Sequence, residues 1–222
     1  MLFSIIRSGF SWQNLVLYLL VMGFIIFFVN PIHEYAHAYA AYKLGDNTAK
    51  ACNRLTLNPF ASFDLLGALC MLFVGIGWAK PIPINPRNFK NPKKGMAISA
   101  MWGPLTNLIL AALSMLIYNA VYKFAPYGSS VTYYICTALI YIAQINAMLA
   151  VFNLIPIPPL DGSRIMAGIL PDKYSMWMYK YERYIQIALF VVLFVFSRFI
   201  GILASVVTSG LQWLTSLPFL LF

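Results

Sequence analysis

Long apolar runs dominate this sequence, and they restrict the chain to a membrane fold. Such runs lie at about 13–42, 96–122, 131–155 and 184–208. Each is near or above the roughly 20 residues with which an α-helix crosses the hydrocarbon core of a bilayer. The composition agrees, because 61% of the residues are hydrophobic and only 9% are charged. We therefore predict an all-α polytopic protein of the lipid bilayer, a bundle of about four to six transmembrane helices.

A shorter apolar run covers residues 65–79. Its length is marginal for a span, so we interpret it as a re-entrant or interfacial segment, with a tilted fifth span as the alternative. The RLTL stretch at 54–57 predicts a short strand pair at the membrane surface. The proline-rich stretch 80–95 cannot be helical and is expected to be extended. The tail, 209–222, is expected to be an interfacial segment anchored by Trp213.

Basic residues are in excess, and the net charge is +9. They are interleaved with prolines in loops and form no recognition helix, so we expect no nucleic-acid partner. Twelve of the 15 Lys and Arg residues lie in three connections, after the first span, before the second and before the last. Cytoplasmic loops carry such an excess. If residues 65–79 do not cross, the pattern predicts a multi-pass protein of the cell membrane with these connections in the cytoplasm. Arg7, Lys123 and Arg198 would then lie outside or snorkel toward the outer surface.

The first apolar run contains HEYAH, residues 33–37, with the chain's only two histidines. On a helix, positions i and i+4 share one face, so His33 and His37 can bind one metal ion through their imidazole nitrogens. Glu34 would then lie beside the metal as the general base that takes a proton from a bound water. A lone buried histidine is usually structural, but ionisable groups at membrane depth are costly and indicate function.

A catalytic zinc site takes three protein ligands and keeps one position open for water. Among the acids of the chain, only Glu34 and Asp161 lie within or directly against an apolar run. Asp161 follows three prolines in NLIPIPPLDG, residues 153–162, which should break the preceding helix near residue 155. It is the candidate third ligand, on a non-helical segment where Gly162 permits a tight turn. The alternative is an acidic residue at an ordinary helix end.

The second apolar run contains GPLTN, residues 103–107. Gly103 lets a neighbouring element approach closely, and Pro104 frees a backbone carbonyl. Asn107 and Asn153 are candidates to bind the scissile carbonyl or its developing oxyanion. The alternative for both is that they join helices through polar contacts.

These three motifs resemble those of the site-2 proteases, intramembrane zinc metallopeptidases of family M50. HEYAH, GPLTN and NLIPIPPLDG occur in the order of the family's membrane motifs, and the similarity covers about residues 28–164. The loop stretches NRLTLNP and GWAKPIPINPRNF resemble short bacterial-type members, so we expect no attached PDZ or CBS domain. The chain departs from many short members at Ser62 and Leu65, where those have histidine and proline.

The resemblance implies a three-helix catalytic core with one zinc ion per chain. Its ligands would be His33, His37 and Asp161, and Glu34 would be the catalytic base. It also implies that Asn107 and Asn153 help to hold the substrate or oxyanion.

We therefore expect a zinc metalloendopeptidase that cleaves a membrane-protein substrate in or near a transmembrane helix, as in regulated intramembrane proteolysis. The active site would face the cytoplasmic leaflet, because the predicted orientation brings its ligands to that depth. Alternatives of another class are a catalytically silent zinc-binding scaffold and a zinc-handling transporter. A transporter needs ionisable residues along a path across the membrane, and here they cluster in one leaflet. The sequence carries no indication of the oligomeric state.

We expect residues 1–222 to form one domain, with the catalytic core at about 13–164 and C-terminal helices at 184–222. Three cysteines occur without a CxxC pair, so we interpret them as small buried apolar groups: Cys52, Cys70 and Cys136.

Overall fold

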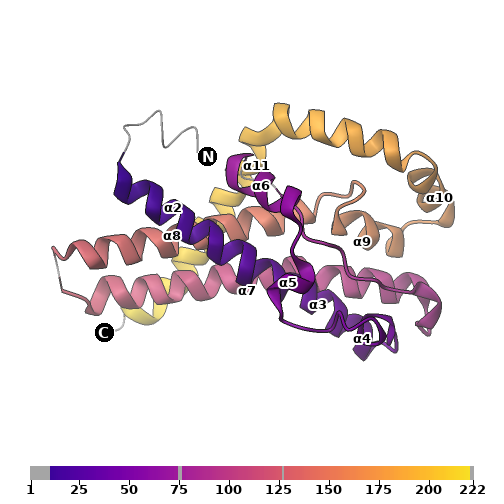
Figure 1. The fold of residues 1–222 in the computed structure, drawn as a ribbon, viewed down its shortest axis with the longest axis horizontal. Coiled ribbons are helices and arrows are strands. Elements are labelled where there is room, and N and C mark those ends of the chain that lie inside the picture. Colours follow the sequence, from indigo (N-terminus) through magenta and orange to yellow (C-terminus); the bar gives the residue numbers. More distant parts are fainter. Residues whose placement is uncertain (1–10, 75–76, 127, 221–222) are drawn as a thin grey trace.

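The computed structural model describes residues 11–74, 77–126 and 128–220. All regular secondary structure within these ranges is helical, and the longest helices run beside one another along the long axis of the molecule (Figure 1). Four helices of the described ranges are long and apolar enough to cross a membrane: Trp12–Lys43, Pro92–Phe124, Ser130–Asn153 and Ile200–Phe219. The prediction of an all-α, multi-pass membrane protein is confirmed.

The first candidate span is a continuous helix built from three parts. These are α2 (Trp12–Phe24), a π-turn (Ile25–Val29) and α3 (Asn30–Lys43). In the π-turn the Asn30 N–H donates to the carbonyl of Ile25, five residues back. Pro31 follows at once and has no N–H to donate. A π-turn holds one residue more than an α-turn, so the chain passes the proline and continues as the helix that carries HEYAH.

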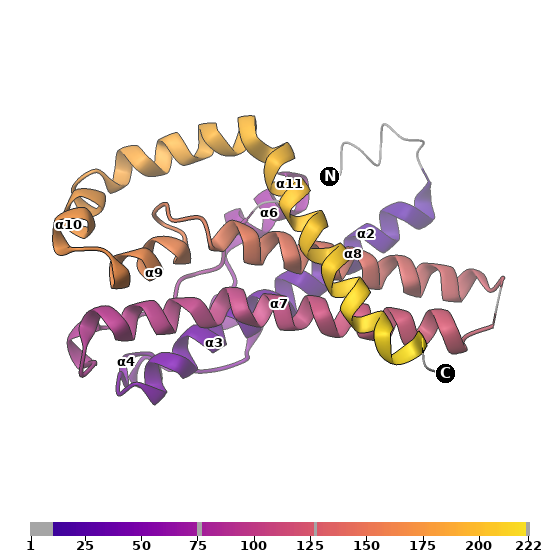
Figure 2. The same cartoon turned by 180° about the vertical axis from the view of Figure 1, so that it is seen from behind.

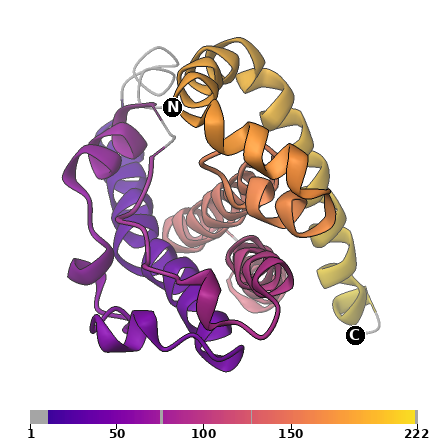
Figure 3. The same ribbon diagram turned by 90° about the vertical axis from the view of Figure 1, so that its right-hand side faces the viewer.

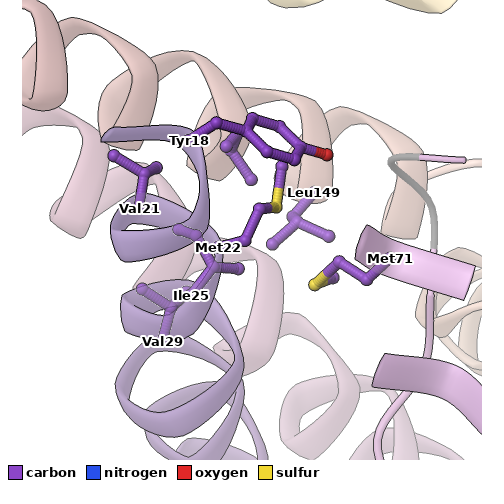
Figure 4. Packing of buried hydrophobic residues seen from close by; sticks show 8 residues of the cluster. Tyr18, Val21, Met22, Ile25, Val29, Met71 and Leu149 are labelled. Atoms are coloured by element: carbon purple, nitrogen blue, oxygen red, sulfur yellow. The ribbon is translucent and has the colours of Figure 1, made fainter. Parts of the chain in front are cut away.

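Two antiparallel helices, α7 (Pro92–Phe124) and α8 (Ser130–Asn153), complete the three-helix core. The side chain of Asn91 caps α7 by accepting from the Lys94 N–H, and Pro92 occupies the first turn. Figure 4 shows how α2 packs beside α8, with Met22 and Ile25 pointing toward Leu149. The buried cluster at this contact has eight members: Tyr18, Val21, Met22, Ile25, Val29, Met71, Ile145 and Leu149.

A short apolar helix, α6 (Leu65–Val74), is too short to cross a membrane. The chain before α6 and the chain after it lie side by side, because the Lys80 N–H donates to the Ser62 carbonyl at 2.9 Å. The returning chain packs directly on α6, since a Cβ on Gly77 would lie 2.1 Å from the carbonyl oxygen of Gly67. These contacts support the interpretation of residues 65–79 as a re-entrant or interfacial segment, which stays a prediction.

The connection between α3 and α6 contains α4 (Thr48–Ala51) and α5 (Pro59–Ser62) but no strand. The predicted strand pair at RLTL, residues 54–57, is wrong. Asn53 adopts a left-handed backbone conformation with φ of 53°, which interrupts the extended chain. The neighbouring segment is joined through a side chain instead of a backbone ladder, because Arg54 Nη2 donates to the Lys80 carbonyl at 2.8 Å. Residues 77–85 have no regular secondary structure, and a single 3₁₀ turn follows at Pro86–Asn88. The prediction that residues 80–95 are not helical is wrong for 92–95, which begin α7, because proline is tolerated in the first turn of a helix.

Beyond α8 the chain forms α9 (Asp161–Ile169), α10 (Asp172–Lys180) and α11 (Glu182–Leu220). Figure 3 shows α9, α10 and α11 on one side of α7 and α8, with α2 to α6 on the other. The helix break after α8 agrees with the prediction. Close packing of α9 on α7 depends on Gly168, because a Cβ there would lie 2.4 Å from the Ala97 Cβ.

The predicted apolar run 184–208 lies within α11, which continues to Leu220. The candidate span among the described residues is Ile200–Phe219, and Figure 2 shows this half of α11 crossing α8 and α7 obliquely. Lys123 Nζ, at the end of α7, donates to the Phe219 carbonyl at 2.6 Å. Residues 209–220 continue α11 as a helix, and the interfacial position of this segment stays a prediction. Residues 221–222 lie outside the described residues.

The basic residues of the described chain gather at one end of the molecule, where α3 ends and α7 begins. The end of α7 and the start of α8 lie at the opposite end, with Lys123 (Figure 1). Arg7 lies outside the described residues, as do the side chains of Arg183 and Arg198. Of the three cysteines, Cys52 is exposed, so the prediction of burial is wrong for it.

Asp46 fastens the proline-rich segment 81–92 to the end of α3. Its side chain is buried, with 1% exposed. The carboxylate accepts from the Asn85 N–H at 2.8 Å and from Asn88 Nδ2 at 2.7 Å. Burial by itself would raise the pKa of this carboxyl, but hydrogen bonds from Thr48, Asn88 and Asn85 lower that pKa below its ordinary value. Asp46 therefore acts as an ionised clamp.

Replacing Asp46 with Ala should release this segment. Because the folded-state pKa of Asp46 is lowered, its stabilisation is present above the ordinary carboxyl pKa of about 4 and is lost as the pH falls through the folded-state value. Hydrogen exchange at the Asn85 amide should be slow in the wild type at neutral pH and fast in Asp46→Ala. Asp64→Ala removes a carboxylate that accepts from Gly67 instead, and it should leave Asn85 protected. Equal protection in the wild type and Asp46→Ala would contradict the clamp.

The re-entrant course also predicts which positions share a side of the membrane. Phe60, which is 76% exposed, and Lys80 flank the re-entrant segment. Single cysteines at these positions, in a chain without its native cysteines, should react with an impermeant maleimide from the same side. Ser130→Cys, at the start of α8, should react from the opposite side. Labelling of Phe60→Cys and Lys80→Cys from different sides would mean that residues 65–79 cross.

Candidate metal centre

Three side chains from α3 and α9 converge at one point. The Nε2 atoms of His33 and His37 lie 3.1 Å apart. Asp161 Oδ2 lies 3.4 Å from His33 Nε2 and 3.1 Å from His37 Nε2. Within the described ranges, this is the cluster of His, Cys, Asp or Glu side chains close enough to hold one metal ion. The structure thus brings together the three ligands that the sequence predicts.

The geometry of the cluster fits zinc. Ligand atoms about 2.0–2.1 Å from a tetrahedral zinc ion lie about 3.3 Å from one another. The separations here are 3.1, 3.4 and 3.1 Å, and two imidazole nitrogens with a carboxylate oxygen are common zinc ligands. Burial alone would raise the pKa of the Asp161 carboxyl, but His37 and His33 beside it hold that pKa well below its ordinary value. The carboxylate is therefore ionised, as a metal ligand must be.

Asp161 is the first residue of α9, so the prediction that it lies on a non-helical segment is wrong. The irregular chain is confined to the residues before it. Gly162 is helical too, and a Cβ there would lie 2.3 Å from the Leu154 carbonyl oxygen and 2.4 Å from that of Ile155. The glycine is needed because α9 starts directly against the backbone that ends α8, and not because of a special turn.

One face of α7 forms the wall of the centre. Ser99, Gly103 and Asn107 are four residues apart, so they lie on the same face of the helix. His37 Nδ1 is 2.8 Å from the Ser99 carbonyl, and His33 Nδ1 is 3.3 Å from Asn107 Oδ1. Gly103 lies between them, where a Cβ would come within 2.2 Å of His37 Nε2. The prediction that Gly103 permits a close approach is confirmed.

The two remaining predicted residues differ in their surroundings. Glu34 is half-buried on α3, and its charge acts on the His37 ring. Asn153 is half-buried at the last position of α8, and its side chain has no hydrogen bond to another described residue. Asn107, in contrast, is 1% exposed and is joined to the ligand His33.

Two features of the centre's surroundings were missed at the level of sequence. The Ser99 acceptor is a backbone carbonyl, which leaves no signal in residue type. The available clue was that Ser99 lies four residues before Gly103, which places both on one face of a helix. Asn146 on α8 is fully buried, with Nδ2 donating to the Ile142 carbonyl at 2.9 Å and Oδ1 without a hydrogen-bond partner among the described residues. Nothing in the pattern of α8 distinguishes it from an asparagine that faces a neighbouring helix.

Adding a methyl group at Gly103 should separate α7 from the histidine pair. We expect Gly103→Ala to weaken zinc binding by about tenfold or more, because overpacking of this kind typically costs 1–3 kcal/mol. Gly23→Ala in α2 is the matched control, since a Cβ there would meet nothing within 4 Å. It should leave the affinity unchanged. Chelator competition measures both, and an unaltered affinity in Gly103→Ala would contradict the close contact.

Comparison with known proteins gives consistent matches. The model of peptidase family M50 matches residues 120–197, which include Asp161 but not the two histidines. YwhC of Bacillus subtilis, a protein named provisionally as a zinc metalloprotease, is 42% identical over 181 residues. That alignment covers 79% of this chain and 80% of YwhC.

More distant relatives carry similar names. The zinc metalloprotease MJ0392 of Methanocaldococcus jannaschii is 28% identical over 174 residues, which cover 78% of this chain and 41% of that protein. Rip2 of Mycobacterium tuberculosis, also named provisionally as a zinc metalloprotease, is 30% identical over 140 residues, or 59% of this chain and 50% of Rip2. No solved structure matches the chain. Because the similarity to YwhC extends over most of both proteins, this chain belongs to peptidase family M50, the site-2 protease family, and is a metallopeptidase.

Proposed function

We propose that the protein is an intramembrane zinc metalloprotease that hydrolyses a peptide bond in or near a transmembrane segment of a membrane-protein substrate. The observation that carries this proposal is the buried cluster of His33, His37 and Asp161 against a helix apolar enough to cross a membrane. Burying such groups at this depth is costly without a function that uses them. The names of YwhC and MJ0392 as zinc metalloproteases support zinc as the metal.

His33, His37 and Asp161 would hold one zinc ion. When bound, zinc polarises the scissile carbonyl and lowers the pKa of a water molecule in the open position. Glu34, adjacent to His33 in the chain, would take the proton of that water and deliver it to the leaving amine. Its half-buried position leaves it free to exchange the proton with a substrate.

The substrate would have to unwind locally before cleavage. Carbonyls of a transmembrane helix are already hydrogen-bonded within the helix and are shielded from attack. The side-chain amide of Asn153 lies at the end of α8, is half-buried and has no hydrogen bond to another described residue. We propose that this amide donates to a carbonyl of the unwound substrate.

We also propose that the centre faces the cytoplasmic side. Basic residues of the described chain lie at the end of the molecule nearer to α9, and an excess of Lys and Arg is typical of cytoplasmic connections. In intact cells, Lys80→Cys should therefore resist an impermeant maleimide while Ser130→Cys reacts with it. The reverse pattern would invert the proposed orientation.

The deciding experiment compares the wild type with Glu34→Gln. Both proteins are purified, their zinc content is measured, and they are incubated with a model single-span substrate. We expect one zinc ion per chain in both, and a loss of cleavage in Glu34→Gln of at least about a hundredfold, the lower range for a general base. Glu182→Gln, at the only other glutamate of the chain, should cleave as the wild type does.

Two results would reject the proposal in different ways. If both proteins bind zinc and the wild type and Glu34→Gln cleave equally, Glu34 is not the general base. Bound zinc with no cleavage by any variant would favour a zinc-binding scaffold. A folded wild type that binds no zinc would reject the metal centre itself.

A further inference from the structure

We propose that Asn107 is a positioning residue that fixes the tautomer of His33, and that it does not contact the substrate. Together with the Ser99 carbonyl, it would make one face of α7 the element that presents both imidazoles to the metal. The inference rests on the proposed zinc centre and assigns Asn107 and Asn153 different roles.

The two ring nitrogens of a neutral imidazole differ in their chemistry. One ring nitrogen carries a proton, and the other carries the lone pair that binds a metal. An acceptor beside Nδ1 holds the proton there and leaves the lone pair on Nε2. In this structure the Nε2 atoms of both histidines face Asp161, at 3.4 and 3.1 Å. Both rings therefore need an acceptor at Nδ1.

Helix α7 supplies both acceptors. The Ser99 carbonyl, 2.8 Å from His37 Nδ1, can only accept a hydrogen bond. Asn107 presents Oδ1 to His33 Nδ1 at 3.3 Å. The two acceptors are eight residues apart on α7, the two histidines are four apart on α3, and Gly103 lies between the acceptors. A single rigid helix can thus fix both tautomers before any metal arrives.

The amide nitrogen of Asn107, Nδ2, is buried. Asn107 Nδ2 is one of the buried side-chain atoms without a hydrogen-bond partner in the described chain. Because this atom has almost no accessible surface, a substrate carbonyl could reach it only if α3 and α7 separated. That separation would also break the contact of Asn107 with His33. The half-buried Asn153 is under no such restriction.

The test uses the fact that the chain has only two histidines. Protein labelled with ¹⁵N-histidine therefore gives two sets of ring signals, which report the tautomer of each ring directly. Asn107→Asp keeps an acceptor for His33 but has no amide donor, and Asn107→Leu has neither. In metal-free wild type and in Asn107→Asp, both rings should carry the proton on Nδ1.

In Asn107→Leu, His33 should lose this preference, while His37 keeps it and serves as an internal probe of folding. Zinc affinity, measured by chelator competition, should fall about 10- to 100-fold in Asn107→Leu and stay within about threefold of wild type in Asn107→Asp. Asn153→Leu is the control: its tautomers and zinc affinity should match the wild type, and only its cleavage should fall.

Two outcomes overturn the inference. The first is an Asn107→Leu protein with the wild-type tautomer at His33 and the wild-type affinity for zinc. The second is an Asn107→Asp protein that binds zinc normally but does not cleave, which would make Asn107 a donor to the substrate. Failure of the wild type to bind zinc would instead reject the proposed function, and the tautomers of the metal-free protein would still decide the role of Asn107.

Discussion

The contact between α3 and α7 at Gly103 is the constraint on which the rest of the centre depends. Only a residue without a side chain fits there, since a Cβ would lie 2.2 Å from His37 Nε2. The same helix also receives α9, where Gly168 packs against Ala97 and thereby brings Asp161 to the histidines. Two close helix contacts on one helix therefore assemble ligands that are more than a hundred residues apart in the chain. Small residues at such contacts are typical of helix packing in membranes.

Much of the fold was predictable because the signals are local. Apolar length indicates the spans, the spacing of four residues indicates the paired histidines, and three prolines indicate the end of α8. The metal ligands were predictable for a similar reason, since few ionisable residues lie in or against the apolar runs. The order of the three motifs along the chain added the family resemblance, which no single motif indicates.

The features that the sequence did not indicate depend on long-range contacts. The hydrogen bond between the Lys80 N–H and the Ser62 carbonyl joins the two ends of the segment around α6, and no local pattern encodes it. Lys123, almost a hundred residues earlier, binds the Phe219 carbonyl at the end of α11. The RLTL stretch has strand propensity, but it follows the left-handed Asn53, and the Arg54 side chain joins it to Lys80 instead of a backbone ladder. There tertiary context overrides propensity.

The π-turn at Ile25–Val29 has a consequence for how the two halves of this span face the core. An extra residue in one turn rotates everything before it by about 100° relative to everything after it, compared with a straight α-helix. A single helical wheel drawn over the whole span therefore superimposes two faces that do not coincide, the packing face of α2 and the ligand face of α3. Loss of one residue in this turn would restore a plain helix and bring the two faces out of phase with the core. The turn thus sets the rotation of the ligand face of α3 relative to the packing face of α2.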